Sequence, residues 1–552
     1  MNFTDYLFLP AFLISLGLYF IVPKRTRWIV LLVASVLFYF SWGIVLLPFI
    51  MVSSLIAYFA ALKMESKYTK EAAKENAKEG ERGTKEQKSA KRKNKRVLIV
   101  AIGLILVILI YVKLQNYLAE VSLFAGIMES ISTVYDSCVA FLSKIPVASL
   151  FISATDKETG TLSLLYPLGI SYYTLSLIGY LTDVYWKKEK AEKNYLRFFL
   201  FVIYFPKILE GPISKHRNIG SQLNEGHEFD YKRVCFGLQR VVWGYFKKLI
   251  IADRLIVLVN EVFGNVILHM GSELLVAAVF GAVQLYCDFS GCMDIALGVS
   301  ECFGITLEEN FRQPFASRSA AEFWRRWHIT LGAWFKDYVF MPIAVSPRLM
   351  KVTGFLRKHM GKRVGKAFST VVPLVIVWLL TGMWHGTGAN YIIWGIYWGL
   401  LIGISTVFEA EIHKLTQWLK IDTSSGGYVL FQKSRVFCLF VIGRIISIPD
   451  SLAESWYVIQ SIFTSFAPWK LVDGSLYNLG IDRPQFVVVV LAIILVGFVG
   501  SRHEKGVKIR EWIAARPLPI RWLIYYAAIF AVLIFGAYGP GYDASSFIYM
   551  AF

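Results

Sequence analysis

The chain has 552 residues, of which 56% are hydrophobic and only 18% are charged. A soluble domain of ordinary composition carries about a quarter charged residues, so the composition excludes a typical soluble globular protein. The net charge is +19, but the basic residues do not cluster in any segment long enough to form a folded, soluble surface for nucleic acid. In a membrane protein, such an excess is typical of the Lys and Arg residues of cytoplasmic loops.

Several motifs of soluble enzymes are missing. The six cysteines are scattered and none forms a C-x-x-C pair, so we expect neither a disulfide framework nor a metal site. No G-x-S-x-G motif occurs, which argues against a serine acyl-enzyme of the hydrolase type. Residues 361–366 superficially resemble a phosphate-binding loop, but the motif is one residue short and Ala367 replaces its Ser or Thr.

Apolar runs long enough to cross a bilayer, about 20 residues each, recur along the whole chain. They lie near 5–22, 28–43, 46–62, 97–117, 162–182, 234–260, 273–299, 368–383, 388–408, 432–448, 485–499 and 520–537. Interfacial or re-entrant segments are expected at shorter apolar pieces near 121–151, 196–209, 319–345 and 452–468. We therefore predict an all-α polytopic integral membrane protein with about 11–13 transmembrane helices plus re-entrant or interfacial helices.

The loops between these spans indicate an orientation. Basic segments follow the first, third and fifth spans, at residues 23–27, 63–96 and 187–190. All three lie on the cytoplasmic side if the N-terminus is outside, as the positive-inside rule requires. The segment 63–96 has almost no large apolar residue, so we expect a solvated loop that is disordered or loosely helical.

Histidines within apolar segments are candidates for function, because ionisable groups are costly there. Of the eight histidines, five lie among polar loop residues and are expected to be solvated: His216, His227, His359, His413 and His503. His269 ends an apolar run and is expected at an interface. His328 and His385 remain.

His385 lies in the segment Thr-Gly-Met-Trp-His-Gly-Thr-Gly, residues 381–388, between two strong spans. Glycines on both sides of the histidine predict a break where backbone and substrate approach closely. Irregular backbone at membrane depth is tolerated where it lines a cavity or is buried in protein. The alternative is a core histidine that is hydrogen-bonded across helices.

His328 follows the sequence Phe-Trp-Arg-Arg-Trp at residues 323–327. On a continuous helix it would share a face with the residues four before, three after and seven after it: Trp324, Leu331 and Phe335. Arg325 and Arg326 would point elsewhere, toward an interface or an anionic donor. The alternative is an interfacial amphipathic helix with an incidental histidine.

Acidic residues also occur in apolar surroundings. They are Asp183, Glu210, Asp288 and Asp294. Each could position a substrate or support a histidine, but structural pairing is the more ordinary role.

These segments together resemble the membrane-bound O-acyltransferase family, and within it the group of alginate O-acetyltransferase AlgI. The stretches that carry the resemblance are 167–172, 206–212, 245–253, 286–291, 309–311, 322–338 and 384–386. The resemblance covers roughly residues 1–410 and implies a ring of helices around a thinned central funnel. It also implies that His385 is the catalytic histidine and that His328 is the family's second polar residue.

The resemblance further implies an enzyme that moves an acyl group, expected to be acetyl, from a cytoplasmic thioester to a hydroxyl of an extracytoplasmic polysaccharide or its secreted acetyltransferase partner. We expect acetyl-CoA, or an acyl-carrier protein, as donor and no tightly bound cofactor. His385 would be the general base, and His328 would orient or polarise the thioester. Arg312, Arg318, Arg325 and Arg326 could attract the donor's phosphates, and Trp384, Asp288, Arg325 and Arg326 are the weaker substrate-contact candidates.

Two alternatives remain open. A DltB-type protein would move D-alanine from a carrier-protein thioester to teichoic acid. A transporter or flippase would normally show inverted repeats with paired broken helices, and no such symmetry is visible in this sequence.

The expected organisation has four parts in a multi-pass protein of the plasma membrane. They are N-terminal transmembrane helices (1–62), a basic cytoplasmic loop (63–96), the catalytic core (97–410) and C-terminal transmembrane helices (411–552). Membrane lipid, the acyl donor and the extracytoplasmic acceptor are the expected partners.

Overall fold

The computed structural model describes residues 1–43, 46–75, 82–119 and 167–538. These residues form helices and connecting segments, and no β-strand occurs among them. The predicted all-α class is therefore confirmed. The apolar pieces expected near 121–151 lie outside the described residues.

The chain forms two compact units, which we describe separately. The first contains residues 1–237 and 296–307, and the second contains residues 238–295 and 308–552. Two helices, α11 (Tyr231–Tyr245) and α13 (Gly271–Phe303), contribute residues to both. The two units thus interleave along the sequence, whereas the four expected parts are consecutive segments.

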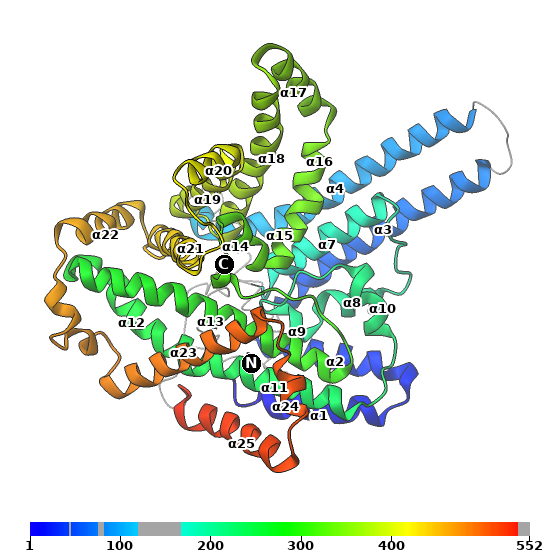
Figure 1. The fold of residues 1–552 in the computed structure, drawn as a ribbon. Helices are drawn as coiled ribbons and strands as arrows, with labels where there is room; N and C mark the ends of the chain where they lie inside the picture. Colours follow the sequence, from blue (N-terminus) through cyan, green and yellow to red (C-terminus); the bar gives the residue numbers. More distant parts are fainter. Residues whose placement is uncertain (44–45, 76–81, 120–166, 539–552) are drawn as a thin grey trace. The chain divides into compact units, whose positions relative to one another are not determined.

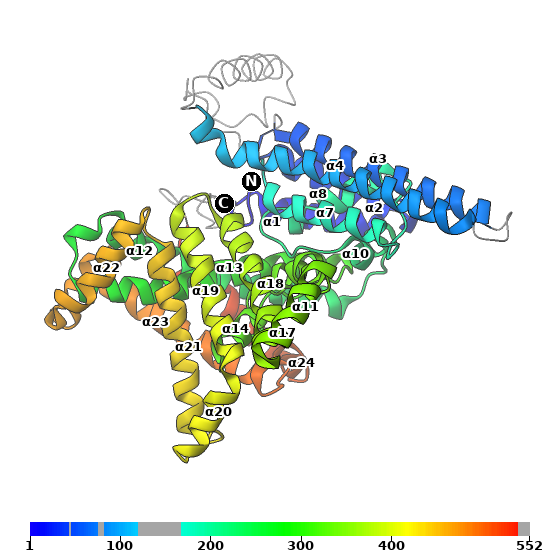
Figure 2. The same cartoon turned by 90° about the horizontal axis from the view of Figure 1, so that it is seen from above.

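The first unit has eight described helices that lie wholly within it. They are α1 (Phe8–Ile21), α2 (Arg27–Phe40), α3 (Leu47–Glu75), α4 (Arg82–Ala119), α7 (Ile170–Tyr185), α8 (Tyr195–Ile203), α9 (Phe205–Ile208) and α10 (His216–Asn224). Helices α3 and α4 lie side by side (Figures 1 and 2), and both pack against α7. The described part of the basic segment 63–96 is helical, because α3 continues to Glu75 and α4 begins at Arg82.

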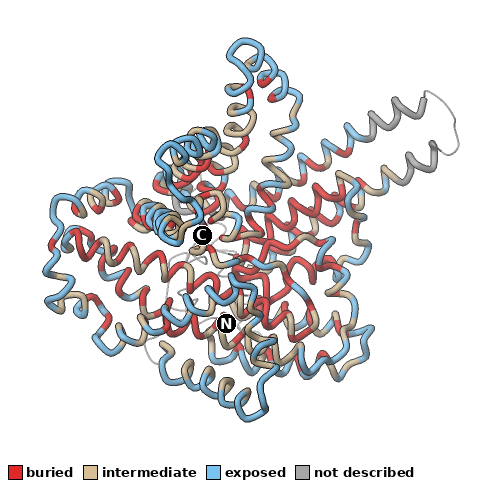
Figure 3. The backbone as a smooth tube through the Cα atoms, in the orientation of Figure 1, coloured by how far each residue is buried: buried red, intermediate tan, exposed pale blue. Residues whose placement is uncertain are grey.

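Aromatic side chains fill the interior of the first unit. Phe8 contacts Phe12 and Phe38, with ring centroids 6.4 and 6.1 Å apart. Phe303 contacts Phe12 and Phe205 at 5.9 and 6.2 Å. Such offset and edge-to-face contacts join α1, α2, α9 and the end of α13. Helix α7 is buried from Ile170 to Val184 (Figure 3).

The second unit holds the remaining helices. They are α12 (Asp253–Gly264), α14 (Ala320–Arg326), α15 (Ile329–Phe335), α16 (Met341–Ala344), α17 (Pro347–Met360), α18 (Lys362–His385), α19 (Ala389–Val407), α20 (Glu409–Trp418), α21 (Gly426–Ser447), α22 (Leu452–Thr464), α23 (Arg483–Glu504), α24 (Ile509–Ala514) and α25 (Leu518–Phe535). A π-helix, η4 (Phe246–Ala252), joins α11 to α12. Of the most apolar 18 residues of α13, 67% are buried by the rest of the protein, whereas none are in α25.

Most of the apolar surface of α13 is therefore covered by protein. The apolar surface of α25 faces outward, as in a lipid-facing helix.

Seven described helices are long and apolar enough to cross a membrane, or eight if the bent pair at 329–360 counts as one span. They include parts of α3 and α4, together with α13, α18, α19, α23 and α25. The protein is thus a multi-pass membrane protein. Among the described residues the number is smaller than the 11–13 expected for the whole chain, and some of the expected spans there are short helices. The runs near 5–22 and 28–43 form helices of only 14 residues each, α1 and α2.

Glycines allow α18 and α19 to approach closely. A Cβ atom at Gly395 would lie 2.5 Å from the backbone oxygen of Trp378 and 3.4 Å from the Cα atom of Gly382. One at Gly382 would collide with the backbone oxygen of Tyr391. Small residues at such crossings are the usual means by which membrane helices bring their backbones together. This crossing lies directly before His385.

We predict that Gly395→Ala lowers the thermal stability of the detergent-solubilised protein by the equivalent of about 1–3 kcal/mol, the usual cost of overpacking. The measurement is thermal unfolding followed by fluorescence-detected size exclusion. Gly403→Ala is the matched control on α19, because its new methyl group would lie in ordinary contact, 3.5 Å from Val371. Equal stability of the two variants would contradict the close crossing.

Candidate active site

His328 lies at a break between two helices. Helix α14 ends at Arg326, and α15 begins at Ile329. Trp327 between them is extended, and His328 has φ 47° and ψ 51°. The prediction that His328 lies within a continuous helix, on one face with Trp324, Leu331 and Phe335, is therefore wrong. A left-handed conformation is uncommon for residues other than glycine, and such strain persists only where the surroundings enforce it.

The segment around Asn310 enforces this break. The backbone N–H of Ile329 donates to the backbone oxygen of Asn310 at 3.0 Å. Phe311 and Trp327 form an isolated antiparallel bridge, and Arg312 N–H donates to the Arg326 oxygen at 2.9 Å. At the break, the backbone N–H of Ile329 and the backbone oxygen of Arg326 therefore pair with residues 310–312. Buried backbone groups need such partners where the helix does not supply them.

The His328 side chain is buried, with 3% of the residue exposed. Its Nδ1 atom lies 3.3 Å from Asn310 Oδ1. The Phe289 ring of α13 meets the imidazole edge to face, with centroids 4.8 Å apart. Burial among aromatic rings favours the neutral form of an imidazole, which is the form that can accept a proton.

His385 is the last residue of α18. The predicted break is confirmed, because Gly386 and Gly388 cap the two helices and α19 begins at Ala389. A Cβ atom at Gly386 would collide with the Tyr391 ring, so the turn has no room for a side chain there. His385 is buried, with 7% exposed.

The structure brings both candidate histidines together in the second unit. Their ring centroids lie 6.5 Å apart. Trp384 contacts both, at 5.9 Å from His328 and 4.8 Å from His385. Trp394 of α19 lies 5.2 Å from His385. Aromatic rings from α13, α18 and α19 thus surround the two imidazoles.

Asp288, expected as a weak substrate contact, lies in a buried ion cluster. Its carboxylate is 2.6 Å from the Lys248 ammonium, which is also 2.8 Å from Asp253. Asp288 is 0% exposed and Lys248 is 1% exposed. Buried charges need such pairing, so the geometry favours structural pairing, the more ordinary of the two roles considered from the sequence. Asp183 of the first unit is similarly placed, 3.6 Å from Arg217.

The two arginines that follow Trp324 differ in environment. Arg326 lies 2.8 Å from Glu322 and 2.7 Å from Glu504, so two carboxylates already offset its charge. Arg325 is exposed. Of the two, Arg325 is therefore better placed to meet an anionic group from solution.

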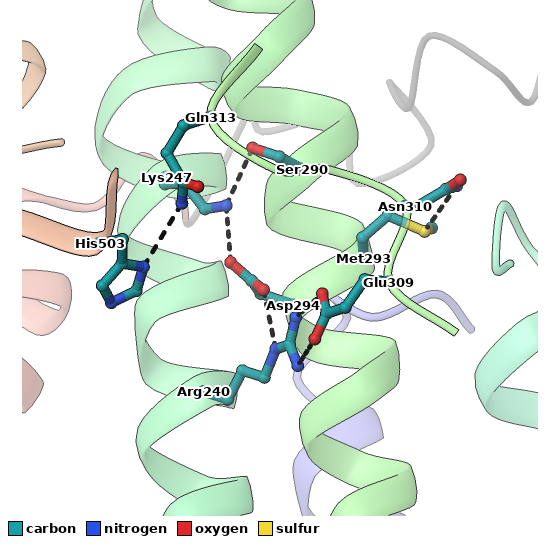
Figure 4. A network of polar contacts seen from close by, with 9 residues as sticks. All are labelled: Arg240, Lys247, Ser290, Met293, Asp294, Glu309, Asn310, Gln313 and His503. Atoms are coloured by element: carbon teal, nitrogen blue, oxygen red, sulfur yellow. Dashed lines mark hydrogen bonds and ion pairs between the residues drawn. The ribbon is translucent and has the colours of Figure 1, made fainter. Parts of the chain in front are cut away.

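A second polar network supports the segment that contacts His328 (Figure 4). Arg240 of α11 pairs with Glu309 through both terminal nitrogens, at 2.7 and 2.6 Å, and with Asp294 at 2.9 Å. Lys247 lies 2.6 Å from Asp294 and donates to Ser290 at 2.9 Å. Bidentate Arg–carboxylate pairs fix geometry as well as charge, so the network holds Glu309 and the residues next to it.

His216, expected in a solvated loop, is buried, so that prediction is wrong. It begins α10 and is hydrogen-bonded to Glu189. The rings of Tyr180 and Phe201 lie 5.1 and 4.9 Å from its imidazole. Aromatic rings of the first unit thus cover the start of α10, which the polar neighbours of His216 in the sequence did not reveal.

Sequence reasoning assigned no role to Asn310 or Phe289, although both were within segments that carried the family resemblance. In the sequence, Asn310 is a single asparagine between Glu309 and Phe311. Asparagine is common in ordinary loops, so nothing there pointed to a role for it. Only the structure shows that the amide meets residues 328–330.

Comparison with known proteins gives the family. Residues 192–443 match the model of the membrane-bound O-acyltransferase (MBOAT) family. The chain is 30% identical over 502 residues to the "Probable alginate O-acetylase AlgI" of Pseudomonas putida, a match that covers 91% of this chain and 87% of the relative. The chain belongs to the MBOAT family. It is an O-acyltransferase, and the family resemblance noted in the sequence is confirmed.

Two other relatives of this MBOAT protein differ in their named activities. The chain is 30% identical over 280 residues to the peptidoglycan O-acetyltransferase of Helicobacter pylori, with 46% of this chain and 50% of the relative covered. It is 28% identical over 290 residues to the teichoic acid D-alanyltransferase of Bacillus subtilis, with 50% and 68% covered. Membership of a family of acyltransferases argues against the transporter alternative.

We predict that Lys248→Met greatly reduces the amount of folded protein, because Asp253 and Asp288 would lose their shared cation within a buried site. Breaking a buried pair in this way costs about 3–5 kcal/mol. Asp288→Asn should be mild, because Lys248 keeps Asp253. The measurements are membrane yield and thermal stability, with the exposed Lys505→Met as control. A normal yield of Asp288→Asn with lost acyl transfer would instead indicate a substrate contact for Asp288.

Proposed function

We propose that this MBOAT protein transfers an acetyl group from a cytoplasmic thioester, acetyl-CoA, to a hydroxyl of an extracytoplasmic polysaccharide or of a secreted partner that completes the transfer. The observation that carries the proposal is the pair of buried imidazoles, His328 and His385, 6.5 Å apart at two helix breaks. Irregular backbone at membrane depth is tolerated where it lines a cavity or is buried in protein.

The chemistry needs a proton acceptor beside the thioester. A neutral imidazole of the pair, with His385 proposed as the base, takes the proton of the acceptor hydroxyl as its oxygen attacks the thioester carbonyl. The new C–O bond forms, the C–S bond breaks, and the proton passes to the thiolate of coenzyme A. No covalent acyl-enzyme is required.

The share of this chain that each relative matches supports acetyl transfer over D-alanyl transfer. The match to the alginate O-acetylase relative extends over 91% of this chain, whereas the match to the D-alanyltransferase of B. subtilis covers 50%. The peptidoglycan O-acetyltransferase relative also acts, by its name, on a cell-wall glycan. These names support an acetyl donor and a surface glycan as acceptor.

The proposed location is the plasma membrane, with the N-terminus outside. The basic segments 23–27, 63–96 and 187–190 would then face the cytoplasm. Arg325, exposed near the end of α14, is proposed to contact the donor's phosphates, since Arg matches phosphate geometry.

We predict that His385→Ala and His328→Ala each reduce acetylation of the surface polymer by about 100-fold or more, the usual contribution of acid–base catalysis. The measurement is ester content of the polymer from cells that carry each variant, normalised to the amount of protein in the membrane. His413→Ala, on the exposed α20, is the control and should acetylate normally.

An unchanged ester content in His385→Ala, with the protein inserted at the normal level, would contradict the proposal. D-alanine released from the polymer by mild base, in place of acetate, would instead assign the D-alanyl reaction.

A further inference from the structure

The orientation of the Asn310 amide is fixed by its neighbours. Its Oδ1 atom accepts two hydrogen bonds from Thr330, from the backbone N–H at 3.0 Å and from the hydroxyl at 2.9 Å. Its Nδ2 group donates to Met293 Sδ at 3.4 Å (Figure 4). Exchanging the amide oxygen and nitrogen would place an NH₂ group against the Thr330 N–H, and two donors cannot pair. Only 1% of Asn310 is exposed.

This orientation determines where His328 carries its proton. An amide oxygen can only accept a hydrogen bond. The 3.3 Å contact between His328 Nδ1 and Asn310 Oδ1 therefore requires the hydrogen on Nδ1. A neutral imidazole has one N–H, so Nε2 of His328 carries a lone pair.

The residues next to Asn310 are themselves held by charged groups. Glu309, the preceding residue, receives two hydrogen bonds from Arg240, which also pairs with Asp294. Met293, one residue before Asp294 on α13, receives the Asn310 amide hydrogen bond. The charged network of α11 and α13 thus fixes Glu309, which precedes Asn310, and Asp294, which follows Met293.

We infer that Asn310 is a positioning residue that locks His328 in the Nδ1–H tautomer, so that Nε2 of His328, beside the proposed base His385, can only accept a proton or a hydrogen bond. This inference rests on the proposed function of the histidine pair. It excludes the expected alternative in which His328 polarises the thioester carbonyl, because that role needs an N–H at the substrate side. Asparagine or a carboxylate commonly sets the histidine tautomer in this way in other enzymes.

The groups that face His328 determine how the inference can be tested. Phe289 of α13 and Trp384 of α18 carry no titratable charge, and Asn310 and Thr330 are neutral. His385 is a titratable group beside His328, with ring centroids 6.5 Å apart. A carboxylate placed at position 310 would therefore be the one new charge beside Nδ1.

The test compares Asn310→Asp with Asn310→Ala in proteoliposomes. Labelled acetyl-CoA is the donor, the chemically de-esterified surface polymer of the same cells is the acceptor, and the pH varies from about 5.5 to 9. In Asn310→Asp the carboxylate keeps the Thr330 bonds and stabilises the imidazolium, so His328 stays protonated to higher pH. The acid limb of the rate profile should move up by about one pH unit or more, and activity should recover at alkaline pH.

Asn310→Ala removes the side-chain bonds to Thr330 and the acceptor that keeps the hydrogen on His328 Nδ1. Its rate should fall by about 10- to 100-fold at every pH, the cost of a misplaced catalytic group. Asn94→Asp and Asn94→Ala are the matched controls. Asn94 is also a fully buried asparagine, and its amide donates to the backbone oxygen of Met64 at 3.1 Å in the first unit. These variants should leave the acid limb where it is in the wild-type protein.

An acid limb that stays at its wild-type pH in Asn310→Asp would overturn the inference, and so would an equal shift in Asn94→Asp. If Asn310→Ala does not fold, Thr330→Val provides a milder test, because it removes one bond to Oδ1 and keeps the backbone bond. Full activity of His328→Ala would instead overturn the proposed function of the histidine pair, so the two failures are distinguishable.

Discussion

The bonding between Asn310 and residues 328–330 is the contact on which the candidate site depends. In the interior of a membrane protein every backbone polar group must find a partner within the protein. Where α14 gives way to α15, the helix cannot supply those partners, and the backbone and side-chain oxygens of Asn310 do so instead. The same side chain then meets His328. The break in the helix and the placement of the imidazole therefore have one cause.

The charged residues of α11, η4 and α13 must also find partners within the protein. Arg240, Lys247, Lys248, Asp288 and Asp294 would each be costly in an apolar environment. Their mutual pairing offsets this cost and fixes α13 against α11 and η4. Since Arg240 also holds Glu309, the ion pairs give rigidity to a segment that otherwise has little regular structure. Replacing such a network by apolar residues is often neutral for stability in other proteins, which suggests that its use here is geometric.

The sequence predicted what depends on local composition and periodicity. Apolar runs predicted the membrane class. The glycines around His385 predicted the end of α18, because glycine is a residue type at which helices commonly end.

The break at His328 has no such residue beside it. Residues 323–331 have an ordinary helical pattern, and what interrupts the helix is a contact with a segment about 18 residues earlier in the chain. His216 shows the same limit, since its polar neighbours gave no sign of the aromatic rings of α7 and α8 that cover it. Contacts between distant segments override local preference, and one sequence does not reveal them.

The two histidines reach their positions by different physical means, and this difference bears on how they can share the chemistry. His385 ends a helix at glycines, which fix the backbone by the absence of side chains, and aromatic rings border its imidazole. His328 is held through its own ring nitrogen as well as through its strained backbone. When Nδ1 of a neutral imidazole donates a hydrogen bond, Nε2 is the one ring nitrogen left to accept a proton. The site thus pairs one histidine of fixed tautomer with a second that stands at a glycine-bounded turn, which is the asymmetry expected when two chemically identical groups must take different parts in one proton transfer.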